Sequence, residues 1–135
     1  MLTTGATLEP AVLDALKAAG TKTVYIAGGE GVVSAAKEQA LKDAGFTVIR
    51  LAGANRYETA AKLAELTPKT SKVMLATGAN FADALSGGGL AASLDANLEL
   101  YAPSTTNVSV PKGTTDAYLL GGPGAIPSTV TLTAK

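Results

Sequence analysis

The chain has 135 residues, with eleven Lys plus Arg against eleven Asp plus Glu, and so no formal net charge at neutral pH. This length predicts a single domain, residues 1–135, that buries a core without disulfides, and the neutral charge argues against bulk electrostatic binding of nucleic acid. Because the sequence has no His and no Cys, the usual general base, the commonest metal ligand and the strongest protein nucleophile are missing. We therefore expect no cofactor and no metal site.

Short apolar stretches alternate with helical patterns along the chain. The strands are expected at residues 24–27, 46–49, 73–76, 98–101 and 118–120, and the helices at 10–19, 34–44, 55–66 and 80–94. Most of the strand stretches are apolar on both faces, which predicts parallel strands covered by helices. Pro68 should prevent the third helix from continuing. The alternating order predicts an α/β fold in three layers, with a mostly parallel central sheet flanked by helices.

A glycine motif occurs twice, each time directly after an apolar strand. The stretch GGEGVV at 28–33 returns as GGPGAI at 121–126, an offset of 93 residues. The chain therefore contains about one and a half copies of a repeat unit. Between the copies, residues 104–115 are rich in Ser, Thr, Asn and Pro, which predicts a loop where the first copy has a helix.

A second motif also occurs twice, again between a strand and a helix. GANRYE at 53–58 matches GANFAD at 78–83. An Asn followed three residues later by an acid is typical of a capping box, so Glu58 and Asp83 are expected to cap helices that begin at Asn55 and Asn80. Both motifs also follow strand carboxyl ends, where open α/β sheets place their binding sites. Capping and ligand binding therefore both remain open.

Taken with their spacing, these residues resemble the cell wall-binding repeat type 2 family, which forms repeats in surface proteins of Gram-positive bacteria. The matching stretches are VYIAGGEGVVS (24–34), VIRLAGANRYETAAKLAE (48–65) and VMLATGANFADALSGGGLAAS (73–93). They follow the family's order and begin in the middle of a repeat. Beyond Leu94 the chain departs from the family, because the Pro-initiated strand and the long helix that the family has there are missing.

The resemblance implies a Toprim-like, Rossmann-like α/β fold without catalytic activity. It also implies noncovalent anchoring of a parent protein to an anionic cell-wall polysaccharide at the cell surface, as in S-layer proteins, with no nucleic-acid partner and no membrane insertion. Three repeats, or a homotrimer, commonly act together in the family. The first ten residues lack the features of a secretory signal, so a surface location would require a longer parent chain or another export route.

The candidate ligand site combines helix amino termini, small residues and arginines. Helix amino termini carry unpaired N–H groups that can hold a phosphate or carboxylate, and an Arg can add a bidentate fork. We expect the site at the carboxyl ends of the central strands. Its candidate residues are Asn55, Arg56, Thr77, Asn80, Gly28, Gly29 and Arg50. The alternative for Arg56 is an ion pair with Asp83 or Glu58, and the alternative for the glycines is a tight turn.

Other functions remain possible at this level. Glu58 and Asp83 could serve as a metal-binding or glycosidase-like carboxylate pair, although the Asp-x-Asp pair of Toprim chemistry is absent. The glycine turns are a weak match to nucleotide-binding loops. The chain could instead be an assembly protein, such as a virion surface component. Because the resemblance implies that three repeats act together and this chain supplies one complete repeat, we expect a homo-oligomer, most simply a trimer, with the small-residue surface at 87–92 as a candidate contact.

Overall fold

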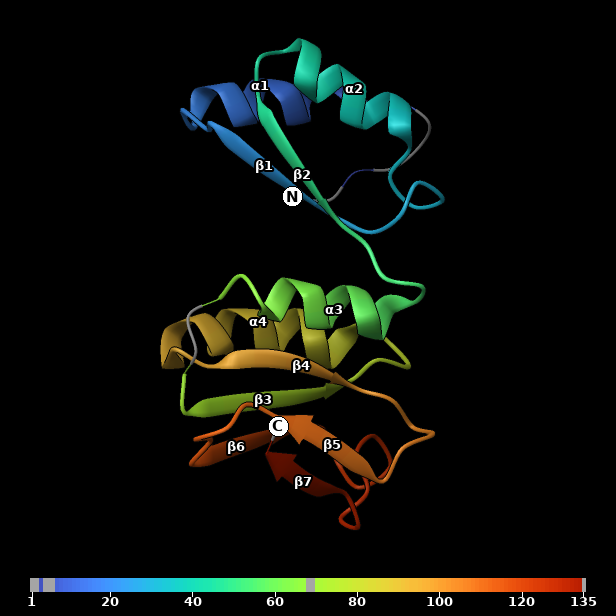
Figure 1. The fold of residues 1–135 in the computed structure, drawn as a ribbon, viewed down its shortest axis with the longest axis vertical. Coiled ribbons are helices and arrows are strands. Elements are labelled where there is room, and N and C mark those ends of the chain that lie inside the picture. The colour runs from blue at the N-terminus through green and yellow to red at the C-terminus, as the bar shows by residue number, and fades with distance from the viewer. Residues whose placement is uncertain (1–2, 4–6, 68–69, 135) are drawn as a thin grey trace. The chain divides into compact units, whose positions relative to one another are not determined.

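The structure is a computed structural model that describes residues 3, 7–67 and 70–134. Its contacts divide the chain into two compact units, unit 1 (Met1–Asn55) and unit 2 (Arg56–Lys135). Each unit combines helices with parallel strands (Figure 1). This confirms the predicted α/β class, while the single domain expected from the length stays a prediction.

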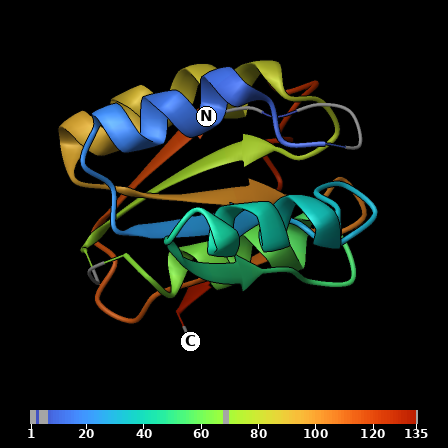
Figure 2. The same ribbon diagram turned by 90° about the horizontal axis from the view of Figure 1, so that it is seen from above.

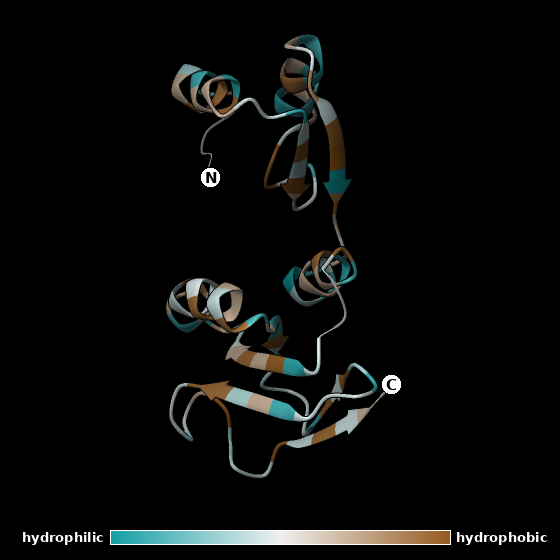
Figure 3. Cartoon of the chain, turned by 90° about the vertical axis from the view of Figure 1, so that its left-hand side faces the viewer, coloured by the Kyte–Doolittle hydropathy of each residue, from teal (hydrophilic) through white to brown (hydrophobic). Residues whose placement is uncertain are grey.

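Unit 1 is a two-stranded parallel sheet with both helices packed against one face. Its elements are α1 (Pro10–Ala18), β1 (Thr23–Ala27), α2 (Ala35–Asp43) and β2 (Thr47–Leu51). The two strands run side by side in the same direction (Figures 1 and 2). Ile26 is buried with Leu41 of α2, and Leu16 of α1 packs against the same cluster. On the other face Tyr25 is 51% exposed and Ile49 40%, so no described element of unit 1 covers that face. Both strands are largely hydrophobic (Figure 3).

Local signals set the helix ends of unit 1. Pro10 opens α1, at a position where the missing N–H costs no helical hydrogen bond. Ser34 precedes α2, and its hydroxyl accepts a hydrogen bond from the backbone N–H of Lys37 at 3.4 Å, as an N-cap residue does. Gly45 follows α2 with φ of +91°, the left-handed conformation that commonly ends helices.

Unit 2 contains a three-stranded and a two-stranded parallel sheet. Its elements are α3 (Arg56–Ala64), β3 (Lys72–Thr77), α4 (Ala82–Leu94), β4 (Asn97–Tyr101), β5 (Asn107–Val110), β6 (Asp116–Leu120) and β7 (Thr131–Ala134). The strands are ordered β4-β3-β6 in one sheet, and β5 pairs with β7 in the other. Figure 1 shows α3 and α4 on one side of the larger sheet and the β5–β7 pair on the other.

The central strand β3 forms the core of unit 2. Residues 73–76 have no exposed surface. Val73 and Leu75 join a buried cluster with Val108 of β5. On the other side of the strand, Met74 lies against Gly87 of α4. Burying a side chain of the size of Leu75 stabilises a fold by about 1.5–3 kcal/mol, so this strand holds the two covering layers of unit 2 together.

A β-α-β arrangement occurs in both units with an offset of 50 residues. Thr23 of β1 pairs with Thr47 of β2, and Val73 of β3 pairs with Asn97 of β4, in each case 24 positions later. At the strand ends, the N–H of Gly28 donates to the carbonyl of Leu51 at 2.8 Å, and that of Gly78 to Tyr101 at 2.9 Å. The residues that follow the helices, Gly45 and Asp95, both have positive φ. The elements β1-α2-β2 and β3-α4-β4 are therefore structural counterparts.

The glycine repetition seen in the sequence is also a structural repetition. Strands β1 and β6 each have five residues, and each is followed by a glycine with positive φ, Gly28 at +121° and Gly121 at +104°. In the first turn, the carbonyl of Gly29 accepts from the N–H groups of residues 32 and 33, and in the second the carbonyl of Gly122 accepts from those of residues 125 and 126. After the turn, unit 1 continues into α2 and unit 2 into β7.

Several sequence expectations need correction. The described strands form three sheets rather than one central sheet, because β1 and β2 pair with each other and with no other described strand. Helices do not flank both faces, since β5 and β7 cover one face in unit 2. The predicted loop at 104–115 contains β5, and β7 was not predicted at all. Helix α3 ends at Ala64, whereas Pro68 lies outside the described residues.

Candidate functional site

A small pocket lies at the strand carboxyl ends of unit 2. Its volume is about 270 Å³. Three segments form it: the residues that end and follow β3, the residues that end and follow β4, and the glycine turn that follows β6. The lining residues are Thr77, Ala79, Asn80, Tyr101, Pro103, Gly124, Ala125 and Pro127. All of these side chains are uncharged, so the pocket itself offers hydrogen-bonding groups and apolar surface rather than charge.

Two predicted site residues, Thr77 and Asn80, line this pocket. Thr77 is 2% exposed, and its hydroxyl oxygen accepts a hydrogen bond from the N–H of Ala79 at 3.2 Å. The side-chain carbonyl of Asn80 accepts from the N–H of Ala82 at 3.3 Å. Because Asn80 is exposed and uses its side-chain oxygen in this bond, its amide NH₂ group can donate to a ligand.

Arg56 and Tyr57 connect the two GAN motifs. The guanidinium of Arg56 donates through Nη1 to the carbonyl oxygen of Gly78 at 2.8 Å. A Cβ atom on Gly78 would lie 2.3 Å from Cε1 of Tyr57, so the tyrosine ring packs where only glycine leaves room. Because Arg56 is exposed and uses one N–H group in this bond, the rest of its fork can reach an anion beside the pocket.

The ion pair expected between Arg56 and Asp83 and the capping box expected of Asn80 and Asp83 are not found in the structure. Among the described residues, no ion pair joins Arg56 to Asp83. The carboxylate of Asp83 instead lies against the turn after β6, where a Cβ atom on Gly121 would be 2.9 Å from Oδ2. Helix α4 begins at Ala82, and its N-cap residue, Phe81, makes no side-chain capping bond. The predicted capping box of Asn80 and Asp83 is therefore wrong, because the helix starts too late, while that of Asn55 and Glu58 stays a prediction.

Arg50 serves the fold of unit 1. Its Nε donates to the carboxylate of Glu38 at 2.7 Å and its Nη1 to the carbonyl of Gly28 at 2.7 Å, and the side chain is 15% exposed. It thereby ties β2 to α2 and to the first glycine turn. Hydrogen bonds from Lys42 and then from Arg50 lower the pKa of the Glu38 carboxyl below its ordinary value. The role of Arg50 as a ligand contact stays a prediction.

The structure brings only part of the predicted site together. Arg56, Thr77 and Asn80 belong to unit 2, whereas Gly28, Gly29 and Arg50 belong to the separate β1–β2 sheet. We expected the three strand-to-helix turns to meet at the edge of one sheet, and the structure places them on two separate sheets. Within unit 2 the place of the first glycine turn is taken by its repetition after β6. That repetition was visible in the sequence, whereas nothing in the sequence indicated Tyr101, Pro103 or Pro127.

The described residues contain neither a membrane-spanning helix nor a cluster of metal-ligating side chains. None of their helices is long and apolar enough to cross a membrane. No group of three or more Asp or Glu side chains lies close enough together among them to hold a metal ion.

Comparison with known proteins supports the resemblance noted above. Residues 50–131 match the family described as cell wall binding domain 2 (CWB2). Among solved structures, Cwp6 from Clostridium difficile is similar at 25% identity and a TM-score of 0.73, over 93% of this chain and 21% of that one. Cwp8 from Clostridium difficile is similar at 22% identity and a TM-score of 0.66, over 84% and 21%. The chain thus spans about a fifth of each. No curated protein matches it.

Proposed function

The chain belongs to the cell wall binding domain 2 (CWB2) family, and on this premise we propose that it is a non-catalytic module that binds an anionic cell-wall polysaccharide. In this role it anchors a parent protein noncovalently at the cell surface. The observation that carries the proposal is the contact between the two motifs within the family match, in which Arg56 and Tyr57 pack on Gly78 beside the unit 2 pocket.

The chemistry of this place suits a charged polysaccharide. The side chain of Asn80 and the backbone groups of the pocket can bond sugar hydroxyls. The exposed fork of Arg56 suits a phosphate or carboxylate oxygen, which Arg binds in a planar, bidentate manner. The start of α3, which follows Asn55, adds backbone N–H groups that favour an anion. Asn55, Arg56, Thr77 and Asn80 are therefore the residues that we assign to the ligand.

Several modules acting together would raise the affinity. One pocket of this size binds a polymer weakly, whereas linked or associated sites raise the effective concentration of each for the same polymer. We propose that the parent protein presents three such modules, either as repeats or as a trimer. A Toprim-like, Rossmann-like arrangement of the fold belongs to this same proposal.

A pull-down with isolated cell walls tests the function. We expect the wild-type chain to sediment with intact walls and to remain in solution after the secondary polymers have been extracted. Arg56→Ala should abolish sedimentation without changing the melting temperature, and Arg56→Lys should restore it only in part, because Lys keeps the charge but not the fork. Lys112→Ala is the matched control, since it removes an exposed positive charge of unit 2 away from the pocket.

Two results would contradict the proposal. Binding that survives polymer extraction would identify peptidoglycan as the ligand instead. Equal loss of binding in Arg56→Ala and Lys112→Ala would show that general charge, rather than this site, holds the chain on the wall.

A further inference from the structure

The side chains of Thr77 and Tyr101 border the unit 2 pocket from neighbouring strands. Both residues line the pocket, and both are 2% exposed. Thr77 ends β3 and lies opposite Tyr101, which ends β4. Because residues in register on adjacent strands point to the same face of a sheet, the two side chains lie next to each other at the strand ends. Tyr101 belongs to a buried cluster with Val108 of β5, so this is the face that β5 and β7 cover.

The hydroxyl protons of both side chains are unused in the described part of the chain. The oxygen of Thr77 accepts from the N–H of Ala79, while its proton has no acceptor among the described residues. The hydroxyl of Tyr101 has no described partner either. None of the described side chains has a polar atom that is both enclosed and unbonded, so the Tyr101 hydroxyl reaches solvent although the residue is almost fully buried. Each hydroxyl can therefore still donate one hydrogen bond to a ligand.

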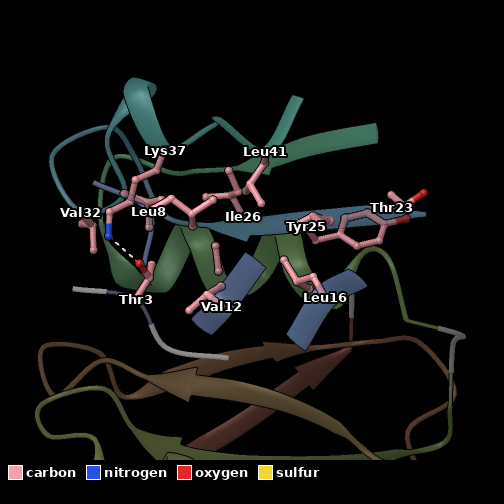
Figure 4. A pocket seen from close by; sticks show the side chains of 13 residues that line it. Thr3, Leu8, Val12, Leu16, Thr23, Tyr25, Ile26, Val32, Lys37 and Leu41 are labelled. Atoms are coloured by element: carbon pink, nitrogen blue, oxygen red, sulfur yellow. Dashed lines mark hydrogen bonds between the residues drawn. The ribbon is translucent and has the colours of Figure 1, made fainter. Parts of the chain in front are cut away.

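The larger pocket of unit 1 differs in this respect. Its volume is about 580 Å³, and its lining is mostly apolar (Figure 4). The charged group in this lining is the ammonium of Lys37, which donates to the hydroxyl of Thr3 (Figure 4), and that hydroxyl donates to the carboxylate of Glu9. The ammonium and this hydroxyl are thus already bonded within the protein. In the unit 2 pocket, by contrast, the hydroxyls remain available to a ligand.

The remaining walls of the unit 2 pocket are small and apolar. They include Ala79, Pro103, Ala125 and Pro127. Because none of the described lining residues is charged, an ammonium or a carboxylate that entered the pocket would lose water without gaining an ion pair. The volume of about 270 Å³ is just below the roughly 300–1,000 Å³ of typical small-molecule sites, which suits one sugar unit. The pocket therefore favours an uncharged group that accepts a hydrogen bond and has an apolar end.

We propose that the unit 2 pocket binds the acetamido group of an N-acetylated amino sugar within the polymer. The carbonyl oxygen of that group accepts the hydrogen bond that the Thr77 hydroxyl has free, and its methyl group packs against Ala125 and Pro127. The hydroxyl of Tyr101 provides a second polar contact, and the side-chain amide of Asn80 bonds a ring hydroxyl.

Two related groups fit this pocket less well. A free amine is charged at neutral pH, and a plain sugar hydroxyl has no methyl group to cover the apolar walls. The inference rests on the proposed polysaccharide binding and adds the class of sugar that the site selects. The anionic group of the polymer stays with Arg56, which does not line the pocket.

Titration with simple glycosides tests the sugar class. Methyl N-acetyl-β-D-glucosaminide and methyl N-acetyl-β-D-galactosaminide are each added to the isotopically labelled chain, and backbone amides are followed by NMR. At least one of them should shift the amides of Thr77, Ala79 and Asn80 in a saturable manner. Methyl β-D-glucoside, which lacks the acetamido group, should bind about two- to ten-fold more weakly, as expected for the loss of one hydrogen bond. Equal affinity for this glucoside, or no shift with either acetamido sugar, would overturn the proposal.

Removal of single hydroxyls tests the two residues. Tyr101→Phe keeps the ring in the core, so it should not lower the melting temperature, while the affinity for the acetamido glycoside should fall about two- to ten-fold. Thr77→Val should weaken binding similarly, and Thr77→Ser, which keeps the hydroxyl, should bind like wild type. Tyr118→Phe is the matched control, because Tyr118 is exposed on β6 and does not line the pocket. Normal binding by Tyr101→Phe or by Thr77→Val would overturn the proposal.

Sedimentation with cell walls separates this inference from the proposed function. A chain that sediments with walls through Arg56 but shows no preference for acetamido sugars would overturn this inference alone. A chain that binds the acetamido glycosides but stays in solution with intact walls would support the pocket assignment and contradict wall binding.

Discussion

Strands β1 and β3 are counterparts, yet they differ in burial. In β3 the residues Val73 to Ala76 have no exposed surface, whereas in β1 only Ile26 is buried. Unit 2 supplies β3 with a strand on each edge and a layer on each face. Unit 1 supplies β1 with one strand and helices on one face. An apolar sequence pattern thus identifies strands that can be buried. Whether such a strand is buried depends on the strands and layers that lie next to it.

The largest difference between β1 and β3 is expected when a residue at the same position of each strand is truncated to alanine. Leu75→Ala should destabilise unit 2 by about 2–5 kcal/mol, because it empties a fully buried site. Tyr25→Ala should cost unit 1 less than about 1 kcal/mol, because that side chain is half exposed. Urea titration followed by peptide-level hydrogen exchange reports each unit separately. A Tyr25→Ala cost as large as that of Leu75→Ala would mean that the face of unit 1 that carries Tyr25 is covered in solution.

The glycines of α4 give a second, smaller test. A Cβ atom on Gly87 would lie 2.1 Å from Cδ1 of Leu120, so Gly87→Ala should cost about 1–3 kcal/mol through overpacking. A Cβ atom on Gly88 would meet no atom within 4 Å outside the helix's own backbone, so Gly88→Ala should stabilise the helix by up to about 1 kcal/mol. Thermal unfolding of the two variants checks the contrast, and equal effects would contradict the packing of α4 on the sheet.

This packing narrows the oligomer contact expected at 87–92, which stays a prediction for the residues of this stretch that are not buried. Gly87 and Ala91 are buried inside unit 2, so they are unavailable to a partner. Within the run of three glycines, the packing explains only Gly87, because an added Cβ atom would meet the sheet there and nothing within 4 Å at Gly88 or Gly89.

The two arginines allow a third comparison. Arg50→Ala should destabilise unit 1 by about 1.5–3 kcal/mol, as expected for the loss of hydrogen bonds that involve a charged group. Arg56→Ala should cost unit 2 less than about 1 kcal/mol, because the residue is exposed and makes a single bond to Gly78. Chemical denaturation distinguishes them. A large loss of stability in Arg56→Ala would assign it a structural role and remove the main support for the ligand site.

The smallest expected effect is a pH dependence confined to unit 1. Because the folded state lowers the pKa of Glu38, this carboxylate stabilises unit 1 fully above its unfolded pKa, and the contribution is lost as the pH falls through the lower, folded pKa. Glu38→Gln should therefore lower stability at neutral pH and converge with wild type in acid. Hydrogen exchange of unit 1 peptides across this range provides the measurement. Parallel curves for the two proteins would show that Glu38 does not titrate with folding.

The sequence predicted the local elements well and their assembly less well. Periodicity located α1 and α2, because Pro10 and Ser34 mark their starts. The short strand β7 was not predicted, because the segment around Thr131 is mostly polar and Leu132 alone does not make a strand pattern. Likewise, the contact between Tyr57 and Gly78 depends on how α3 packs on the sheet. The repetition in the sequence was informative at Gly121, because the turn after β1 recurs there in the structure.

The two glycine turns share a backbone while differing in side chains. Hydrogen bonds to the carbonyls of Gly29 and Gly122 fix the same loop, whether it reads Glu-Gly-Val or Pro-Gly-Ala at the next three positions. In unit 2 those positions supply Gly124 and Ala125 to the wall of the pocket. Main-chain hydrogen bonds therefore set the shape of this loop, and its side chains can differ from one copy to the other while the backbone stays the same.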